Sequence, residues 1–330
     1  MVATAETTAA PAENGSAAEQ TALGKRLLTG DGVPLEPQRG AALIASAAAN
    51  GDAEAAALAA VLIALGAQSA VDWTKALEYL QQAAESGWHP AQRQLIVLSG
   101  EAELEERAQF SAPPETWGRL RRSIDISAWL TVPPPREISG TPRIALHESF
   151  LAPRICKWLI ARATPGLSRS QVFAPSGMAS VADARTNSAF EFGLLSLDLV
   201  LLLTRARIAA AAGFAPHALE HTNVLHYAAG QRFSRHYDFL DPALPGLQQE
   251  IAARGQRVGS FLVYLNDDYS GAETEFSLLD RRLRCPTGGA LSFRNVEPSG
   301  APDRATLHAG LPPASGEKWL LSQWIRDRSG

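Results

Sequence analysis

The feature that most constrains the fold is a series of short apolar segments in the second half of the chain. After Pro142, segments such as GSFLVYLND, ETEFSLL, GALSFRN and KWLLSQWIRD are rich in Phe, Val, Leu and Trp, and Gly, Pro, Asp or Asn bounds each one. Short strands separated by frequent turns predict an antiparallel sandwich or barrel. Two segments with helical spacing, residues 150–163 and 195–214, precede most of these strands.

The N-terminal part of the chain predicts helices that repeat. The residues AAANG at 47–51 recur as AAESG at 83–87, a shift of 36 residues, and the same shift carries Gly30 onto Gly66. Small residues at helical spacing, with a glycine closing each helix, predict stacked helix pairs whose backbones approach closely. The alternative is an Ala-rich helical lid, because alanine by itself favours helix. Only the repeat predicts a concave face for a partner.

These patterns divide the chain into four predicted parts. Residues 1–20 lack apolar periodicity, so we expect a disordered tail. Residues 21–100 carry the helical repeat. Residues 101–141 combine a helix start with the stiff, Pro-rich connector TVPPPREISGTP. Residues 142–330 form the strand-rich domain.

The composition excludes several functional classes. The net charge of −4 argues against a large nucleic-acid surface. The two cysteines, Cys156 and Cys285, have no paired spacing, so the sequence indicates neither a disulfide framework nor a zinc site. No secretory signal is visible, and the longest apolar runs fall short of a membrane span. We therefore expect a soluble, cytoplasmic protein that binds neither nucleic acid nor membrane.

The segment HYDFLD, residues 236–241, carries the first chemical signal. It resembles the start of a strand, and His236 and Asp238 are separated by one residue, so both side chains should project from the same face. A third ligand is needed, and His308 in ATLHAG is the candidate. Two histidines and one carboxylate on one side of a metal leave the opposite positions open, the arrangement suited to non-haem Fe(II).

Lys318 supplies the second chemical signal. It follows His308 by ten residues, in GEKW, and on the next strand it could reach back as a point charge for the distal carboxylate of a bound acid. Each feature is weak by itself, because an HxD pair is common by chance and a lone histidine is more often packed or exposed. Their order within a string of short strands favours a metal-dependent enzyme.

The same motifs carry a family resemblance. Residues 142–330 resemble the prolyl 4-hydroxylase family of Fe(II)- and 2-oxoglutarate-dependent oxygenases. LHYAAGQRFSRHYDF is similar to the family's tyrosine, glycine, aromatic and HxD segment, and FLVYLNDDYSGAETEF resembles its Tyr-Leu-Asn strand and Gly-Gly-Glu-Thr-x-Phe turn. PTGGALSFRN and LHAGLPPASGEKWLLSQW are similar to its closing strands. The helical part, with AALIASAAANGDAEA, resembles Sel1-like repeats, relatives of the tetratricopeptide repeat.

The resemblance implies an α+β chain: a C-terminal double-stranded β-helix, or jelly roll, with flanking helices, after an all-α Sel1-like segment. It implies that His236, Asp238 and His308 bind Fe(II), and that Lys318 pairs with the distal carboxylate of 2-oxoglutarate. It places four more residues in the cosubstrate pocket: Tyr227, Tyr264, Thr274 and Trp324. Core filling is the alternative for the aromatic residues. O2 is the implied oxidant, and ascorbate is a candidate reductant.

The sequence departs from the family pattern in two places. Ala272 stands where the second glycine of the turn usually lies, a change that a turn can tolerate. RTNSAF replaces the usual Arg-Thr-Ser loop, and its Asn187 looks inserted. In relatives this loop helps to hold peptide substrates, so the change bears on substrate identity. Arg185 and Arg257 are candidate substrate contacts, and a surface salt bridge is the alternative role for each.

The predicted function is hydroxylation of a C–H bond, of a prolyl residue in a peptide or protein, because a concave helical face suits polypeptides. The first alternative is a hydroxylase of a free amino acid or small metabolite. The alternative from another class is a protein that binds a partner through Sel1-like helices and carries a non-catalytic jelly roll. A missing ligand in the triad would favour that alternative, and all three ligands are present.

Overall fold

The computed structural model describes residues 15–67, 69–101, 112–170, 172–173, 179–180 and 185–328. The chain forms two compact units, the first comprising Met1–Trp129 with Gly193–Leu203 and the second comprising Leu130–Phe192 with Thr204–Gly330. The division falls inside helix α11 (Leu199–Ala212). Residues 193–203, which the sequence assigned to the strand-rich domain, therefore group with the N-terminal helices.

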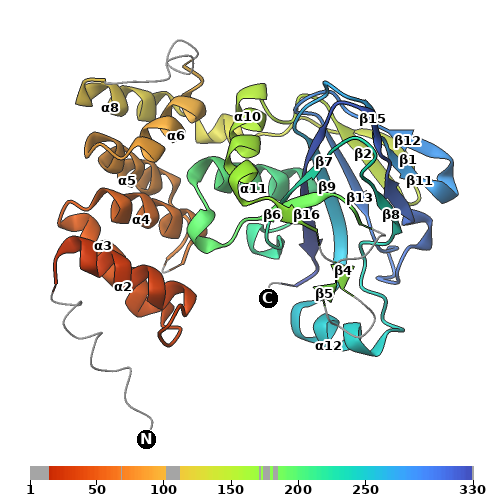
Figure 1. The fold of residues 1–330 in the computed structure, drawn as a ribbon, viewed down its shortest axis with the longest axis horizontal. Helices are drawn as coiled ribbons and strands as arrows, with labels where there is room; N and C mark the ends of the chain where they lie inside the picture. The colour runs from red at the N-terminus through yellow and green to blue at the C-terminus, as the bar shows by residue number, and fades with distance from the viewer. Residues whose placement is uncertain are drawn as a thin grey trace, which may run out of the picture. The chain divides into compact units, whose positions relative to one another are not determined.

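The first unit consists of helices that pack on their neighbours in sequence order (Figure 1). Each helix of the pair α5 and α6 begins 36 residues after its counterpart in the pair α3 and α4, so the predicted helical repeat is confirmed. The helices are α2 (Ala17–Thr29), α3 (Pro37–Ala49), α4 (Ala53–Leu65), α5 (Trp73–Glu85), α6 (His89–Ser99), α8 (Pro114–Ser123) and α9 (Ile126–Leu130).

Two glycines let the backbones of α2 and α3 approach closely. A Cβ atom at Gly40 would lie 2.8 Å from the carbonyl oxygen of Gly24 and 2.9 Å from Cγ of Leu28. A Cβ atom at Gly24 would lie 2.9 Å from Cδ1 of Ile44. Contacts this short exclude any larger side chain without movement of one helix, so the predicted close approach of small residues is present here.

The predicted end of the N-terminal tail is wrong for residues 17–20, which form the first turn of α2. Ser16 and Glu19 make a capping box: the Ser16 N–H donates to Glu19 Oε2 at 2.8 Å, and the Glu19 N–H donates to Ser16 Oγ at 3.4 Å. These bonds satisfy main-chain donors that the helix leaves unpaired, so the helix begins there. Residues 1–14 lie outside the described residues.

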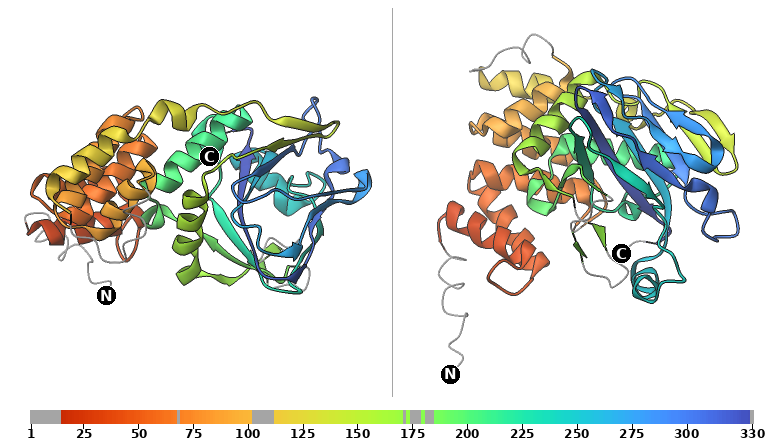
Figure 2. Two further views of the ribbon diagram at one scale, coloured as in Figure 1. Left: turned by 90° about the horizontal axis from the view of Figure 1, so that it is seen from above. Right: turned by 45° about the vertical axis from the view of Figure 1, so that its right-hand side comes forward.

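The second unit contains two β-sheets that face each other (Figure 2). Among the described residues, the larger sheet has the order β1-β2-β13-β9-β16-β7-β6-β3 and the smaller has the order β12-β11-β14-β8, with antiparallel pairing in every ladder. Two short pairs, β10–β15 and β4–β5, lie outside these sheets. The predicted jelly-roll architecture is confirmed.

The strands and remaining helices have the following bounds. The larger sheet contains β1 (Arg136–Gly140), β2 (Arg143–His147), β13 (Ala290–Arg294), β9 (Arg257–Tyr264), β16 (Lys318–Arg326), β7 (Asn223–Tyr227), β6 (Ser188–Glu191) and β3 (Ser168–Arg169). The smaller contains β12 (Arg281–Leu283), β11 (Thr274–Phe276), β14 (His308–Gly310) and β8 (Phe233–His236). The others are β10 (Ser270–Gly271), β15 (Pro313–Ser315), β4 (Val172–Phe173), β5 (Ala179–Ser180), α10 (Pro153–Ala163) and α12 (Pro245–Arg254).

The core of the second unit lies between the two sheets. Every second residue of a strand faces this space, so β9 contributes Leu262 and Tyr264, and β13 contributes Leu291 and Phe293. Phe276 of the smaller sheet joins the same buried cluster. This alternation also decides which polar side chains of the same strands reach the interior.

The Pro-rich connector was predicted to continue to residue 141, and this prediction is wrong for its last part. Residues 136–140 form β1, which pairs with β2 at the edge of the larger sheet. An edge position suits this segment because prolines 133–135 come directly before it, and proline has no N–H to donate to a neighbouring strand. The helical part of the predicted linker is found as α8 and α9.

In the described part of the chain, no helix is both long enough and apolar enough to cross a bilayer. Cys156 and Cys285 are both buried and free. The cytoplasmic location stays a prediction.

The glycine contact between α2 and α3 generates a stability prediction. Gly40→Ala should destabilise this pair by about 1–2 kcal/mol, because the clash outweighs the higher helix propensity of alanine. Gly118→Ala in α8 is the matched control, since its Cβ would meet only side-chain ends at 3.2 Å or more. Hydrogen-exchange mass spectrometry should show faster exchange of α2 and α3 in Gly40→Ala alone. Unchanged exchange would contradict the close approach.

Candidate metal centre

Three side chains that are far apart in the sequence converge between the sheets. β14 pairs with β8 so that His308 lies opposite His236, and the two imidazole centroids are 4.2 Å apart. Asp238 follows β8 directly. One ligand atom from each of His236, Asp238 and His308 lies within 4.8 Å of the others. The strand register therefore brings together the three residues that the sequence proposed as metal ligands.

The spacing of the ligand atoms suits a single ion. Nε2 of His236 is 3.5 Å from Oδ1 of Asp238, and Nε2 of His308 is 3.6 Å from Oδ2 of Asp238. Ligand atoms at right angles and ~2.1 Å from a metal lie about 3.0 Å apart, so a small inward movement of these atoms completes the coordination. Two imidazoles and one carboxylate would occupy one side of that ion.

Both histidines are held in the tautomer that a metal requires. Nδ1 of His236 lies 2.8 Å from the Ser234 carbonyl oxygen, and Nδ1 of His308 lies 2.9 Å from the Thr306 carbonyl oxygen. A carbonyl only accepts, so each Nδ1 carries the proton and each Nε2 presents its lone pair. Burial, with a contribution from the neighbouring His236, lowers the pKa of His308 to about 4, which keeps that ring neutral.

Asp238 remains ionised although it is buried. Burial by itself would raise the pKa of this carboxyl group, but the imidazoles of His308 and His236 and a hydrogen bond from Ser260 hold the pKa below its usual range. The Ser260 hydroxyl donates to Oδ2 of Asp238 at 2.5 Å. On the other side of the site, the ring of Phe233 stacks on His236 with a centroid separation of 3.5 Å.

The local structure of the HxD segment differs from the prediction. The segment was expected to start a strand, but β8 ends at His236 and Asp238 lies beyond it. Beyond His236 the chain leaves the ladder, and the side-chain amide of Gln256 forms the hydrogen bonds of Leu240 that a neighbouring strand would otherwise form. The Leu240 N–H donates to Gln256 Oε1, and Gln256 Nε2 donates to the Leu240 carbonyl, each at 2.7 Å. Asp238 nevertheless lines the same cavity as His236.

Lys318 lies in the same cavity as the three ligands. Its side chain is 1% exposed, and Nζ donates to the Ala272 carbonyl at 2.7 Å. The rings of Tyr227 and Tyr264 lie 5.6 and 5.0 Å from Nζ. Burial lowers the pKa of Lys318 to about 7. A buried ammonium whose hydrogen-bond acceptor is a neutral carbonyl is suited to a carboxylate ligand.

Ala272 shows how the departure from the family's second glycine is accommodated. The residue has a φ of 57°, in the left-handed region that glycine adopts without cost. It is completely buried, and its N–H donates to the Pro312 carbonyl at 3.2 Å. The turn thus tolerates alanine at the cost of some backbone strain, and it directs the Ala272 carbonyl at Lys318.

The predicted pocket residues do not all reach the cavity. Tyr227, Thr274 and Trp324 line it, and burial raises the pKa of Tyr227 to about 12, so its phenol stays protonated. Tyr264 lies behind them: its hydroxyl is 2.8 Å from Thr274 Oγ1 and donates to the Leu283 carbonyl at 3.2 Å. Within the described residues Nε1 of Trp324 is buried without a hydrogen-bond partner, and it is available to a ligand.

Arg185, the first candidate substrate contact, lines the cavity. Its Cζ lies 4.6 Å from the ring centroid of Phe233, and its Nε donates to Oδ1 of Asn187 at 3.2 Å. Asn187 is itself buried and donates to Ser170 Oγ at 2.9 Å. The asparagine that looked inserted in the sequence therefore orients the guanidinium towards the site.

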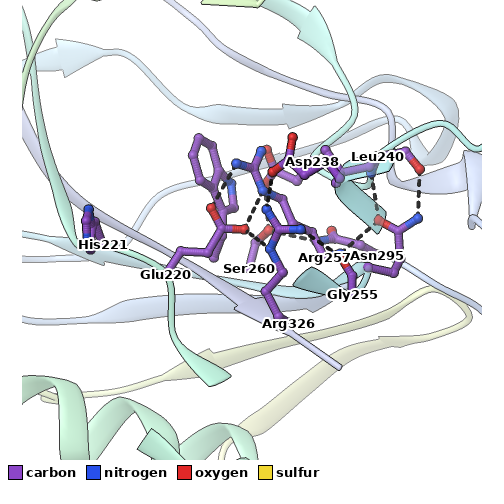
Figure 3. A network of polar contacts seen from close by, with 12 residues as sticks. Glu220, His221, Asp238, Leu240, Gly255, Arg257, Ser260, Asn295 and Arg326 are labelled. Atoms are coloured by element: carbon purple, nitrogen blue, oxygen red, sulfur yellow. Dashed lines mark hydrogen bonds and ion pairs between the residues drawn. The ribbon is translucent and has the colours of Figure 1, made fainter. Parts of the chain in front are cut away.

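Arg257, the second candidate, is outside the set of described residues that line the cavity. It makes a two-point ion pair with Glu220, at 2.7 and 2.9 Å, and Glu220 also accepts from Arg326 at 2.6 Å (Figure 3). The Arg257 guanidinium lies 3.7 Å from the ring centroid of Trp324. The salt-bridge alternative describes this residue better, although the pair is largely buried rather than at the surface.

Sequence reasoning missed Ser260, Gln256 and Asn295. For Ser260 a signal existed, because the predicted strand alternation places it on the same face as Leu262 and Tyr264. Gln256 and Asn295 lie just beyond the ends of β9 and β13, where alternation no longer applies. Only the tertiary structure shows what their side chains contact.

Comparison with known proteins agrees with this arrangement. Residues 222–326 match the family described as the 2OG-Fe(II) oxygenase superfamily. The chain is 30% identical over 217 residues to "Probable prolyl 4-hydroxylase 9" of Arabidopsis thaliana, and the match covers 59% of this chain and 72% of that protein. The chain belongs to the prolyl 4-hydroxylase family. Like the other 2OG-Fe(II) oxygenases, it is a 2-oxoglutarate-dependent dioxygenase that uses Fe(II) and 2-oxoglutarate.

Other proteins similar to this prolyl 4-hydroxylase homologue match different shares of its length. The human "Prolyl 4-hydroxylase subunit alpha-3" is 28% identical over 267 residues, covering 76% of this chain and 48% of that protein. The crystal structure of the viral collagen prolyl hydroxylase of Paramecium bursaria Chlorella virus-1 is 26% identical, covering 56% of this chain and 95% of that one, with a TM-score of 0.43. A Sel1 repeat protein of Oxalobacter formigenes is 23% identical over 34% of this chain and 84% of that one, with a TM-score of 0.26.

The residues of the site fit the two groups that the family requires. Two neutral imidazoles and one ionised carboxylate form a donor set that suits Fe(II). Lys318 offers the charge for one end of 2-oxoglutarate, and Thr274 and Tyr227 offer hydroxyl groups in the same cavity. Trp324 adds a buried N–H donor.

The ligand set generates a binding prediction. His308→Ala should weaken Fe(II) binding by more than about 100-fold, because two donors remain and the buried Asp238 loses a neighbour that favours its charge. His221→Ala is the matched control, since His221 is exposed and contacts Glu191. Anaerobic titration with Fe(II) measures both affinities. Near-native binding by His308→Ala would remove this residue from the ligand set.

Proposed function

We propose that this prolyl 4-hydroxylase homologue uses O2 to hydroxylate a prolyl residue in a peptide or protein. One observation carries the proposal: a single buried cavity contains the three ligand side chains and the ammonium of Lys318. The names of the relatives support the choice of a prolyl residue. Ascorbate is the proposed reductant that keeps the iron ferrous.

In this reaction the residues of the cavity would bind the iron, fix the cosubstrate and exclude water. When bound, Fe(II) and 2-oxoglutarate supply the activation of O2, and one oxygen atom goes to the substrate C–H bond while 2-oxoglutarate becomes succinate and CO2. His236, Asp238 and His308 hold the ion from one side and leave the opposite positions open. Lys318 fixes the far carboxylate. The apolar walls that exclude water from the cavity are formed by Leu225, Leu262 and Leu320.

A second candidate substrate class has an observation in its favour. Arg185 presents a buried guanidinium in the same cavity as the metal ligands, and burial lowers the pKa of this group without removing its charge at neutral pH. A guanidinium in that position would suit the carboxylate of a free amino acid or small metabolite. Hydroxylation of such a molecule is therefore the alternative to a peptide substrate.

Substrate-coupled succinate release separates the two classes. The enzyme would be assayed with Fe(II), 2-oxoglutarate and ascorbate, and with Pro-containing peptides, free proline or a mixture of free amino acids as the substrate. The proposal predicts succinate release above the substrate-free rate with the peptides only. Release with free amino acids alone would establish the alternative, and Asp238→Ala serves as the blank.

The helical unit is proposed to bind a polypeptide, either the substrate or a partner. The support is a hollow in this unit lined by both apolar and polar side chains, in which Val71 is 46% exposed. Its lining includes Ile63, Trp73 and Ile126 beside Asp72, Thr74 and Lys75. A Val71→Asp variant should lose a partner that co-purifies with the native chain, while its rate with a short peptide stays native. Equal co-purification would argue against this surface.

The buried ammonium generates a pH prediction. Lys318 has a pKa of about 7 in the free protein, and a bound carboxylate raises it, so binding above pH ~7 must take up a proton. The Kd for 2-oxoglutarate should be constant below about pH 7 and then rise by up to tenfold per pH unit. Anaerobic calorimetry with Mn(II) in place of Fe(II) measures this dependence.

Lys318→Arg is the control for this experiment, because a guanidinium keeps its charge across the range and should remove the pH dependence. A native Kd that does not change between pH ~6 and ~9 would show that another group binds the distal carboxylate.

A further inference from the structure

We propose that Ser260 and Asn295 are positioning residues of the metal centre, which orient the Asp238 carboxylate and join it to the turn that carries His308. Figure 3 includes Asp238, Ser260 and Asn295 in one network of polar contacts, and all three residues are buried. The inference rests on the proposed metal site. It concerns the residues of this chain that hold the site, and neither residue belongs to the ligand set.

The hydrogen bonds of this relay have a fixed direction. Ser260 is on β9 and 1% exposed, and Asn295 follows β13 and is fully buried. Nδ2 of Asn295 donates to Ser260 Oγ at 3.0 Å, and Ser260 Oγ donates to Oδ2 of Asp238 at 2.5 Å. The amide nitrogen can only donate, so the single proton of the serine goes to the carboxylate. With the amide reversed, one proton would face two acceptors.

This direction has a consequence for the metal. Each oxygen of Asp238 lies near one ligand histidine, Oδ1 at 3.5 Å from Nε2 of His236 and Oδ2 at 3.6 Å from Nε2 of His308, but only Oδ2 accepts the serine proton. A carboxylate with one oxygen held in this way is biased towards binding an ion through the other oxygen. Binding through both oxygens would fill a further coordination position, which the cosubstrate needs.

Asn295 also connects to the second histidine through the main chain. Its carbonyl accepts from the Asp303 N–H at 3.0 Å, and the Asp303 carbonyl accepts from the Thr306 hydroxyl at 2.6 Å. The Thr306 carbonyl in turn accepts from Nδ1 of His308 at 2.9 Å. Asn295 is therefore linked to Asp238 by its side chain, through Ser260, and to His308 by its main chain, through the turn that contains Thr306.

The stability of the fold alone does not explain an asparagine at this position. Within the described residues, Oδ1 of Asn295 is buried without a hydrogen-bond partner, and leaving such an oxygen unpaired destabilises a protein. An apolar side chain of similar size would avoid that cost. The amide group is explained by its nitrogen, Nδ2, which donates to Ser260 Oγ and so directs the serine proton towards Asp238.

Co(II) binding under anaerobic conditions tests the relay, because Co(II) occupies Fe(II) sites and its visible absorption reports the ligand geometry. Ser260→Ala should raise the Kd for Co(II) by about 10- to 100-fold and alter the spectrum of the bound ion. Ser260→Thr keeps the hydroxyl and should restore both. Asn295→Asp has the same shape but accepts from the serine, so it should also weaken binding.

Ser292→Ala is the matched control. Ser292 lies on β13 and its hydroxyl is 2.9 Å from Nε2 of His147, so the substitution removes a similar hydrogen bond from the same sheet, away from the ligands. Its Kd and spectrum should be native. Thermal unfolding without metal, followed by circular dichroism, shows whether each variant is folded.

The outcomes separate the inference from the proposed function. Co(II) binding by both Ser260→Ala and Asn295→Asp within about threefold of native, with unchanged spectra, would overturn the positioning role while leaving the metal site intact. No Co(II) binding by the native chain would sink the proposed function and the relay together. If Ser260→Ala does not fold, the other two variants still test the positioning role. The role predicts that Asn295→Asp loses the native spectrum of the bound ion and that Ser260→Thr retains it.

Discussion

The pairing of β8 with β14 is the constraint on which the site depends. It sets His308 opposite His236 across an antiparallel ladder, although more than seventy residues separate them in the chain. Side chains alternate along a strand, so a slip of one residue would turn His308 to the opposite face of the smaller sheet. The apolar core between the sheets opposes such a slip, because it would also expose the buried residues of β11 and β14. Packing and catalysis thus require the same register.

The buried charges of the second unit fall into two kinds, and the difference identifies the ligand. Arg257 and Arg326 both pair with Glu220, and Arg326 also pairs with Glu250, so two carboxylates balance two guanidiniums and the cluster needs no further charge. The Arg257 guanidinium also packs on the ring of Trp324. Asp238 has only two imidazoles beside it, and these are neutral donors to a metal rather than counter-charges. Lys318 donates to a main-chain carbonyl. Because burying a charge without a counter-charge is costly, the site is complete only with a cation at one end and a carboxylate at the other.

The sequence could predict most of the site, because the ligands and Lys318 follow short-range rules: an HxD spacing, strand alternation and the order of motifs. The Ser16 to Glu19 capping box was also legible, and it would have placed the start of α2 correctly. Arg257 could not be assigned, since its partner Glu220 is distant in the chain. The role of Asn295 could not be predicted either, because it depends on contacts with β9 and with the turn before β14. β1 was obscured by the prolines that precede it.

The most direct test of the account is the position of the iron in a crystal. Crystals grown anaerobically with Fe(II), measured at the iron absorption edge, give an anomalous difference map that locates the ion. The account predicts one peak about 2.1 Å from Nε2 of His236, Nε2 of His308 and a single oxygen of Asp238. A peak elsewhere, or iron bound with the imidazole of His308 turned away from it, would contradict the account.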